Sequence, residues 1–175
     1  MNEEYRERVL KVKAVILDVD GVLTDGRLIL GNYGDELKFF DIHDGFGIEM
    51  LRRAGLKTAM ITGRKSRINE RRAKELKTAL FQKVKDKLKI YEKLLKKFGI
   101  HSDEACYMGD DIPDVPVLRR AGFAVAVENA VDEAKQFSHY VTRKGGGRGA
   151  VREVAELILK IQNKWEGATR SVLPR

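Results

Sequence analysis

The chain of 175 residues carries 34 lysines and arginines against 26 aspartates and glutamates, a formal net charge of +8 at pH 7. This length suits one domain with a sizeable buried core, and a hydrophobic share of 43% excludes a disordered chain. A basic chain binds nucleic acid or attracts small anionic substrates. Aromatic residues are sparse in the basic stretch 64–97, so no surface for base stacking is expected. We therefore interpret that stretch as a solvated helix surface and expect no nucleic-acid partner.

Cysteine use and hydropathy bear on the cellular compartment. Cys106 is the only cysteine, so the chain can form no internal disulfide. No apolar run is long enough to span a bilayer, and the charged N-terminal segment lacks the apolar core of a signal peptide. We therefore expect a cytoplasmic protein with no membrane partner.

The predicted elements alternate between strands and helices. In chain order, the patterns predict a buried strand at 13–17, a hairpin at 27–40, a helix at 45–54, a strand at 57–61, a helix at 66–76, a strand at 78–81, a helix at 86–98, strands at 105–108, 123–127 and 139–141, and a helix at 150–162. This alternation predicts an α/β fold, namely a three-layer Rossmann-like parallel sheet with helices on both faces and a small β-hairpin flap.

Three of the predicted strands end in polar groups, which are Asp18, Thr62 and Asp110. In parallel sheets of this kind, ligands bind beyond the carboxyl ends of the strands. We therefore expect these three positions to meet at one edge of the sheet.

The segment 18–24 (DVDGVLT) is the strongest motif in the chain. Asp18 and Asp20 stand two residues apart at the end of an apolar strand, so their side chains point the same way. Like charges this close repel unless a cation lies between them, and Mg²⁺ prefers oxygen ligands. Gly21 allows the chain to turn sharply. A capped turn would explain two aspartates alone, but not the whole segment.

The segment 109–114 (GDDIPD) is a second acidic cluster after a strand. Favourable interaction with a helix dipole could explain Asp114. It does not explain why Asp110 and Asp111 crowd at a strand end, for which metal ligation supplies a reason.

Two weaker signals lie between these motifs. Thr62, Gly63 and Arg64 combine a hydroxyl, an unhindered backbone amide and a guanidinium, which suits recognition of phosphate or carboxylate. Lys87, at the start of a predicted helix, would by itself be taken for a solvated lysine.

In number, order and context, these pieces resemble the motifs of the haloacid dehalogenase-like phosphatase superfamily. That superfamily reads D-x-D-G-x-x-T, then Thr or Ser after the second strand, then Lys, then G-D-x-x-x-D. All four motifs occur in this order between Asp18 and Asp114. The resemblance implies a Mg²⁺-dependent phosphatase that works through an aspartyl-phosphate.

The resemblance also implies roles for the catalytic residues. Asp18 would attack phosphorus, and Asp20 would protonate the leaving alcohol and later deprotonate the hydrolytic water. An aspartate at position 20 argues against a dehalogenase, which has no alcohol to protonate. Thr62 and Lys87 would bind the phosphoryl oxygens.

The metal ligands implied by the resemblance come from both acidic motifs. Mg²⁺ would be held by the side chain of Asp18, the backbone carbonyl of Asp20, and Asp110. Asp111 or Asp114 would support these ligands without binding the ion directly.

The spacing between the motifs leaves no room for an inserted cap domain. The stretch 25–61 holds only the hairpin and a helix, and the stretch 63–86 only a helix and a strand. A site without a lid stays wet, so either the substrate is large or a neighbouring subunit closes the site. A phosphatase acting on phosphoproteins would also explain the missing cap, and would be a monomer.

The finer details resemble one capless branch, the 3-deoxy-D-manno-octulosonate 8-phosphate phosphatases, over nearly the whole chain. The matching segments are 24–26 (TDG), the flap hairpin 27–40, 43–47 (HDGFG), 62–64, 109–111, and the tail 145–153. As parts of the domain, the flap spans about 24–40 and the C-terminal Gly-rich loop and helix about 144–163. The resemblance implies one domain over 1–175, a role in lipopolysaccharide synthesis, and a homotetramer in which flap and tail complete a neighbouring site.

The substrate implied is a small anionic sugar-acid phosphate, whose carboxylate needs a cationic partner. Arg64, Arg72 and Arg148 are the candidates by type and placement, although Arg72 also fits a solvated helix position. A sister branch acts on nine-carbon sialic-type acids and tends to carry an acidic residue where Arg64 stands. This difference favours the eight-carbon substrate.

Two alternatives remain beside this interpretation. One is a phosphatase for a nine-carbon 9-phosphate or another sugar phosphate. The other is a non-catalytic basic binding module that kept the fold. The intact residues Asp18, Asp20, Lys87 and Asp110 argue against the module.

Overall fold

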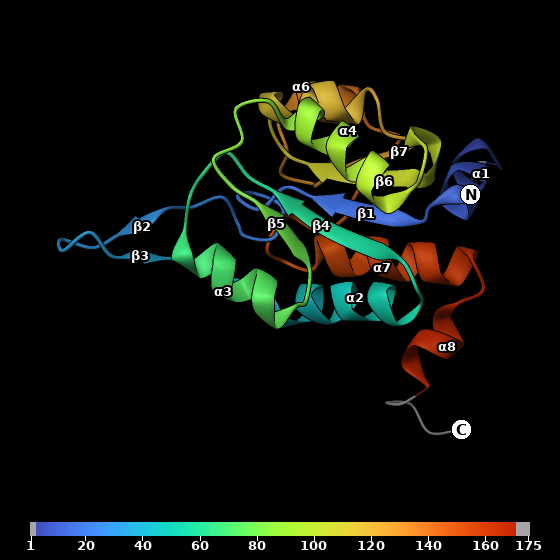
Figure 1. Cartoon of the computed structure of the whole chain (residues 1–175), viewed down its shortest axis with the longest axis horizontal. Helices are drawn as coiled ribbons and strands as arrows, with labels where there is room; N and C mark the ends of the chain where they lie inside the picture. Colours follow the sequence, from blue (N-terminus) through green and yellow to red (C-terminus); the bar gives the residue numbers. More distant parts are fainter. Residues whose placement is uncertain (1–2, 171–175) are drawn as a thin grey trace.

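A parallel sheet of six strands forms the centre of the molecule (Figure 1). The computed structural model describes residues 3–170. The strand order is β5-β4-β1-β6-β7-β8, and every neighbouring pair is parallel. The strands are β1 (Ala14–Leu17), β4 (Lys57–Ile61), β5 (Ala79–Phe81), β6 (Ala105–Gly109), β7 (Phe123–Ala126) and β8 (Tyr140–Val141).

Helices cover both faces of the sheet and complete three layers (Figure 1). The pair α2 and α7 packs together on one face, and α4, α5 and α6 lie on the other. The helices are α1 (Glu3–Lys11), α2 (Ile42–Arg53), α3 (Arg67–Glu75), α4 (Lys87–Phe98), α5 (Val115–Leu118), α6 (Asp132–Gln136), α7 (Ala150–Ile161) and α8 (Trp165–Thr169), with 3₁₀ turns at Ser102–Glu104 and Ile112–Asp114. The predicted three-layer α/β fold is confirmed.

The position of β1 at the middle of the sheet explains its composition. All four of its residues are buried, as expected for a strand covered by helices on both faces. Its last residue, Leu17, lies beside Met60 of β4 and Met108 of β6. The three strands therefore end level with one another, and the polar residues that follow them emerge at one edge of the sheet.

Helix α4 is delimited by side-chain and backbone signals in the sequence. The Asp86 side chain caps its start by accepting the Lys89 backbone N–H at 3.0 Å. Gly99 ends it in the left-handed conformation. Because Lys87 is the first residue of this capped helix, its side chain is placed at the edge of the sheet where the strands end.

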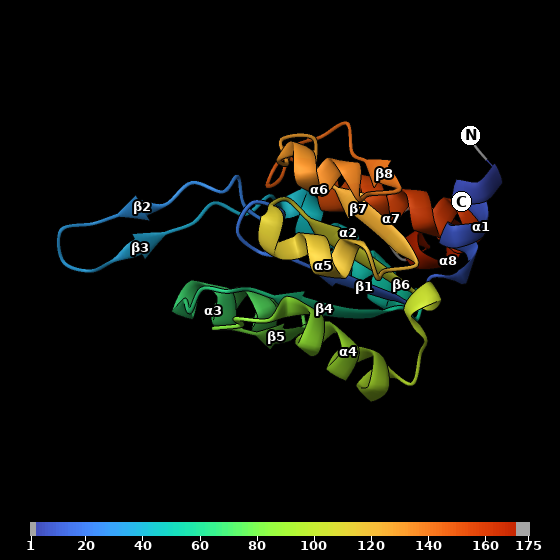
Figure 2. The same cartoon turned by 90° about the horizontal axis from the view of Figure 1, so that it is seen from above.

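A two-stranded hairpin projects from that same edge (Figures 1 and 2). Its strands are β2 (Ile29–Leu30) and β3 (Glu36–Leu37), paired antiparallel. Both are shorter than the segments 27–30 and 37–40 that the sequence predicted. Only Ile29 with Leu37 and Leu30 with Glu36 are paired, and the chain on either side of these pairs is irregular.

Other boundaries also differ from the prediction. Helix α2 begins at Ile42 rather than at position 45, because the Asp41 side chain caps it by accepting the His43 backbone N–H at 2.7 Å. The helices α1, α5, α6 and α8 are absent from the prediction. Within the described residues 3–170, no helix has the length and apolar character needed to cross a membrane.

Candidate active site

The loop after β1 carries Asp18 and Asp20 and turns sharply at Gly21. The Thr24 hydroxyl oxygen closes this turn by accepting the Gly21 backbone N–H at 3.2 Å. Gly21 has φ = +116°, and a side chain added there would collide with the Asp110 carboxylate. Glycine at this position therefore allows the two acidic loops to approach each other.

Three carboxylates converge where β1 and β6 end. Oxygen atoms of Asp18, Asp110 and Asp114 all lie within 4.8 Å of one another. The Lys87 ammonium lies 2.6 Å from Asp18 Oδ1 and 2.6 Å from Asp114 Oδ1. The sheet edge therefore brings together the acidic motifs and the lysine, as expected from the strand ends.

Burial and mutual repulsion dominate the electrostatics of this cluster. Burial, followed by the charge of Asp114, raises the pKa of Asp18 well above its usual range. The same two causes raise the pKa of Asp110 to about 7. Burial disfavours the charged form of Lys87, but Asp18 and Asp114 outweigh burial and raise the pKa of Lys87. The cluster therefore holds more negative charge than one ammonium compensates.

The donor set fits Mg²⁺. The clustered side chains offer only carboxylate oxygens, the ligands that this ion prefers. A divalent cation among them would also relieve the repulsion that raises the pKa of Asp18 and Asp110.

The buried carboxylate of Asp114 holds the second acidic loop through hydrogen bonds. Its carboxylate accepts the backbone N–H groups of Asp110 at 3.1 Å and Asp111 at 3.3 Å, and the Tyr107 hydroxyl at 2.5 Å. The Asp111 side chain turns to the backbone N–H of Ile112 at 2.7 Å. The sequence analysis missed Tyr107. A tyrosine inside a fully buried strand needs a polar partner, and that need was the available signal.

Asp20, the second aspartate of the first motif, contacts Thr62 and Lys38. The Thr62 hydroxyl donates to Asp20 Oδ2 at 2.9 Å and accepts the Arg64 backbone N–H at 3.1 Å. Lys38, which follows β3 in the hairpin, forms an ion pair with Asp20 although its side chain is only 1% exposed. The sequence analysis missed Lys38. No spacing in the sequence relates it to Asp20, because the contact depends on the chain after β3 returning to the sheet edge.

The acidic cluster and Asp20 line a cavity of about 360 Å³. Gly63 and Arg64 belong to its wall, together with the aspartates, Thr62 and Lys87. The Arg64 guanidinium also lies 3.4 Å from Glu36 of the hairpin. An anionic substrate in this cavity would therefore meet three cationic residues of its wall, Arg64, Lys85 and Lys87.

The two other predicted arginines lie away from this cavity wall. Arg72 stacks its guanidinium over the Phe40 ring and pairs with Glu75 at 3.0 Å. Arg148 lies 3.8 Å from Asp25 and lines a separate cavity of about 400 Å³ at the base of the hairpin. The structure therefore brings only Arg64 of the three arginines beside the acidic cluster.

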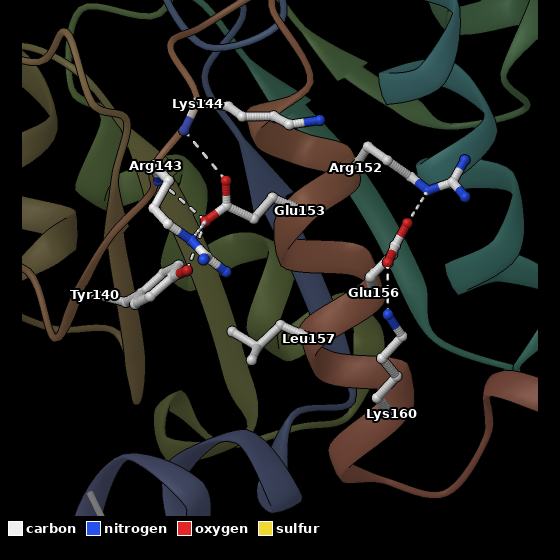
Figure 3. Close-up of a pocket in the computed structure, with 8 residues that line it drawn as sticks. All are labelled: Tyr140, Arg143, Lys144, Arg152, Glu153, Glu156, Leu157 and Lys160. Atoms are coloured by element: carbon white, nitrogen blue, oxygen red, sulfur yellow. Dashed lines mark hydrogen bonds and ion pairs between the residues drawn. The ribbon is translucent and has the colours of Figure 1, made fainter. Parts of the chain in front are cut away.

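The largest of these cavities, about 510 Å³, lies along α7 and does not include the acidic cluster (Figure 3). Its two carboxylates are already occupied, since Glu156 pairs with Arg152 and Lys160, and Glu153 accepts hydrogen bonds from the loop before α7. Because both carboxylates of this cavity are engaged, we assign the chemistry to the smaller cavity, which contains the acidic cluster.

The fold and the acidic cluster are those of a haloacid dehalogenase-like hydrolase, and comparisons with known proteins agree. The sequence profile of the haloacid dehalogenase-like hydrolases matches residues 65–153. A Yersinia pestis protein named 3-deoxy-D-manno-octulosonate 8-phosphate phosphatase KdsC is 45% identical over 168 residues, 95% of this chain and 90% of that protein.

Solved structures extend this similarity to three dimensions. A Moraxella catarrhalis phosphatase of the same name, in complex with magnesium, phosphate and KDO, is 42% identical with a TM-score of 0.94, covering 99% of each chain. A cobalt-bound Haemophilus influenzae phosphatase is 37% identical with a TM-score of 0.87, covering 90% of this chain and 92% of that one. The chain belongs to the KdsC family of 3-deoxy-D-manno-octulosonate 8-phosphate phosphatases.

Proposed function

We propose that the chain hydrolyses 3-deoxy-D-manno-octulosonate 8-phosphate to 3-deoxy-D-manno-octulosonate and phosphate in lipopolysaccharide biosynthesis. The observation that carries this proposal is the cluster of Asp18, Asp110 and Asp114 with Lys87 at the carboxyl edge of the sheet. The names of the relatives indicate the substrate, and the cluster contains groups suited to phosphoryl transfer.

Mg²⁺ is the cofactor of the proposed reaction. The side chains of Asp18 and Asp110 and the backbone carbonyl of Asp20 would hold it, with Asp111 and Asp114 supporting the loop. When bound, the ion neutralises charge on the phosphoryl oxygens.

Asp18 is the proposed nucleophile and Asp20 the proposed acid and base. An Asp18 oxygen forms a bond to phosphorus while the bond from phosphorus to the sugar oxygen breaks, and Asp20 donates its proton to that oxygen. Asp20 then takes a proton from water, which attacks phosphorus and releases phosphate and Asp18. Before the substrate binds, the Thr62 hydroxyl donates to Asp20 and holds it beside the cavity.

Binding of the substrate uses the cationic groups around the cavity. Lys87 and the Thr62 hydroxyl would bind phosphoryl oxygens, and the Gly63 backbone amide lies in the same wall. Arg64 is the preferred partner of the sugar-acid carboxylate because it lines the cavity. Arg148 and Arg72 remain candidates only if a second copy of the chain brings them to this cavity.

The hairpin supports a homotetramer in which flap and tail complete a neighbouring site. Its apolar side chains are exposed to an extent that a monomer rarely shows, and they include Leu30, Tyr33, Leu37 and Phe39. A second copy of the chain would cover this surface and close a site that has no cap. Sedimentation of the purified chain tests this, and a monomer at all concentrations would contradict it.

The proposal also includes a single catalytic domain over 1–175 and a cytoplasmic location. The unpaired, buried Cys106 is compatible with a reducing compartment. Cell fractionation tests the location.

The experiment that tests the substrate is a comparison of kcat/KM for phosphate release with Mg²⁺. One substrate is the eight-carbon 8-phosphate, and the other is a nine-carbon sialic-type acid 9-phosphate. A large preference for the eight-carbon substrate is expected. An equal or reversed preference would keep the phosphatase and reject this substrate.

A further inference from the structure

The glycine-rich segment 145–149 packs directly against the loop that carries Asp18 and Asp20. The Gly147 backbone N–H donates to the Val22 carbonyl at 2.9 Å. A side chain added at Gly146 would lie 1.7 Å from the Gly21 carbonyl oxygen. The glycine segment and the catalytic loop are therefore in direct backbone contact.

This segment cannot be stiffened by its own side chains. Four of its five residues are glycines, which have the greatest backbone freedom to lose. The close approach at Gly146 and the positive φ of Gly147 and Gly149 require residues without side chains. Order in the segment must therefore come from groups outside it.

Glu153 holds the start of the segment (Figure 3). Glu153 lies in the first turn of α7. Its Oε1 accepts the Tyr140 hydroxyl at 2.5 Å and the Arg143 backbone N–H at 3.0 Å. Its Oε2 accepts the Lys144 backbone N–H at 3.2 Å. Both carboxylate oxygens therefore accept hydrogen bonds from the two residues before Gly145, and one of them also accepts the hydroxyl of Tyr140 in β8.

Asp44 holds the end of the segment. It lies in the first turn of α2, just after the hairpin, and is 1% exposed. Its carboxylate accepts the backbone N–H groups of Gly149 at 3.2 Å and Arg152 at 2.8 Å. Gly149 precedes α7 but has no side chain to cap it, so Asp44 supplies the capping oxygens from a distant part of the chain.

We propose that Glu153 and Asp44 are positioning residues for the phosphatase reaction, which clamp the two ends of the glycine segment and thereby hold the loop of Asp18 and Asp20 in its reactive position. The inference rests on the proposed function for its activity readout. Neither carboxylate touches the acidic cluster, so each acts through the segment. The clamp also joins the base of the hairpin to the catalytic loop, because Asp44 belongs to α2.

The test uses Glu153→Gln and Asp44→Asn, each of which keeps the side-chain size. An amide NH₂ in place of one oxygen faces a backbone N–H, so one hydrogen bond is lost at that end of the segment. Glu156→Gln is the matched control, because Glu156 lies one turn along α7 and, within the part of the chain that the structure describes, pairs with Arg152 and Lys160. Tyr140→Phe is a milder second variant that removes one donor to Glu153.

Three experiments are carried out on the full chain: kcat and KM with Mg²⁺ at 25 °C, thermal unfolding for Tm, and hydrogen exchange at 25 °C of the amides at 146, 147 and 149. We expect kcat/KM to fall about tenfold or more in both clamp variants, with faster amide exchange and with a smaller loss in Tyr140→Phe. The control should match the unmodified protein in all three experiments.

A lower Tm with unchanged kcat, KM and amide exchange would overturn the proposal, because it would show a merely structural role. Faster exchange with unchanged kinetics would also overturn it, since the segment would then not position the catalytic loop. If the unmodified chain fails to hydrolyse the octulosonate 8-phosphate, the proposed substrate fails instead, and p-nitrophenyl phosphate serves as the substrate for the same comparison.

Discussion

Removal of the Lys87 charge tests the electrostatic account of the site. Its ammonium compensates two buried carboxylates at once, Asp18 and Asp114, whose side chains are 5% and 1% exposed. Lys87→Met keeps most of the aliphatic stem but leaves both carboxylates without their cation. Loss of one partner of a buried ion pair costs about 3–5 kcal/mol. We expect a loss of free energy of unfolding in that range in the metal-free protein.

Mg²⁺ should reduce this loss, because the ion supplies positive charge to the same carboxylates. Urea unfolding of both proteins, in EDTA and in saturating Mg²⁺, measures the difference directly. The double variant Lys87→Met with Asp114→Asn is the control, and it should recover part of the lost stability because one uncompensated charge has gone. A loss below about 1 kcal/mol that is the same in EDTA and Mg²⁺ would refute the reasoning.

The other predictions concern the nucleophile, the metal and a buried acid. Asp18→Asn should abolish turnover and leave the far-UV circular dichroism unchanged; residual turnover would contradict the covalent mechanism. EDTA should stop phosphate release and Mg²⁺ restore it, and metal-independent release would contradict the site. Burial raises the pKa of Asp44 to about 6, so this group contributes stability at low pH that is lost as pH rises through 6. From pH 4 to 7, the protein should lose on the order of 2 kcal/mol relative to Asp44→Asn; parallel urea-derived curves would contradict this.

Local signals in the sequence predict the elements that stand between clear boundaries. The strand β4 was predicted at its exact bounds, because a segment ending in three apolar residues lies between Gly55 and the polar Thr62. Helix α4 was predicted within one residue, because Asp86 and Gly99 delimit it. By contrast, α1 was not predicted. Its sequence is mostly charged, and only Val9 among its described side chains is buried, against the sheet and α7.

The parts of the site that lie on consecutive strand ends could also be predicted. Asp18, Thr62 and Asp110 follow β1, β4 and β6, which are neighbours in the sheet, so the parallel order alone brings them together. Arg72 shows the limit of this reasoning. It was a candidate by residue type, but its guanidinium lies over the Phe40 ring, and spacing does not predict this contact. Its pair with Glu75, three residues further along the same helix, does follow helical spacing.

Contacts between distant loops account for what the sequence analysis missed. Lys38 reaches Asp20 only because the chain after β3 returns to the sheet edge from which the hairpin projects, and Asp44 reaches Gly149 only because α2 packs on α7. In both cases the hairpin or the residues just after it contact a loop of the site. A capless phosphatase has no inserted domain that could contact its active-site loops. In this chain the hairpin and the glycine segment make such contacts instead. The loop of Asp18 and Asp20 is accordingly held from two sides, by Lys38 at the hairpin and by Gly147 at the glycine segment.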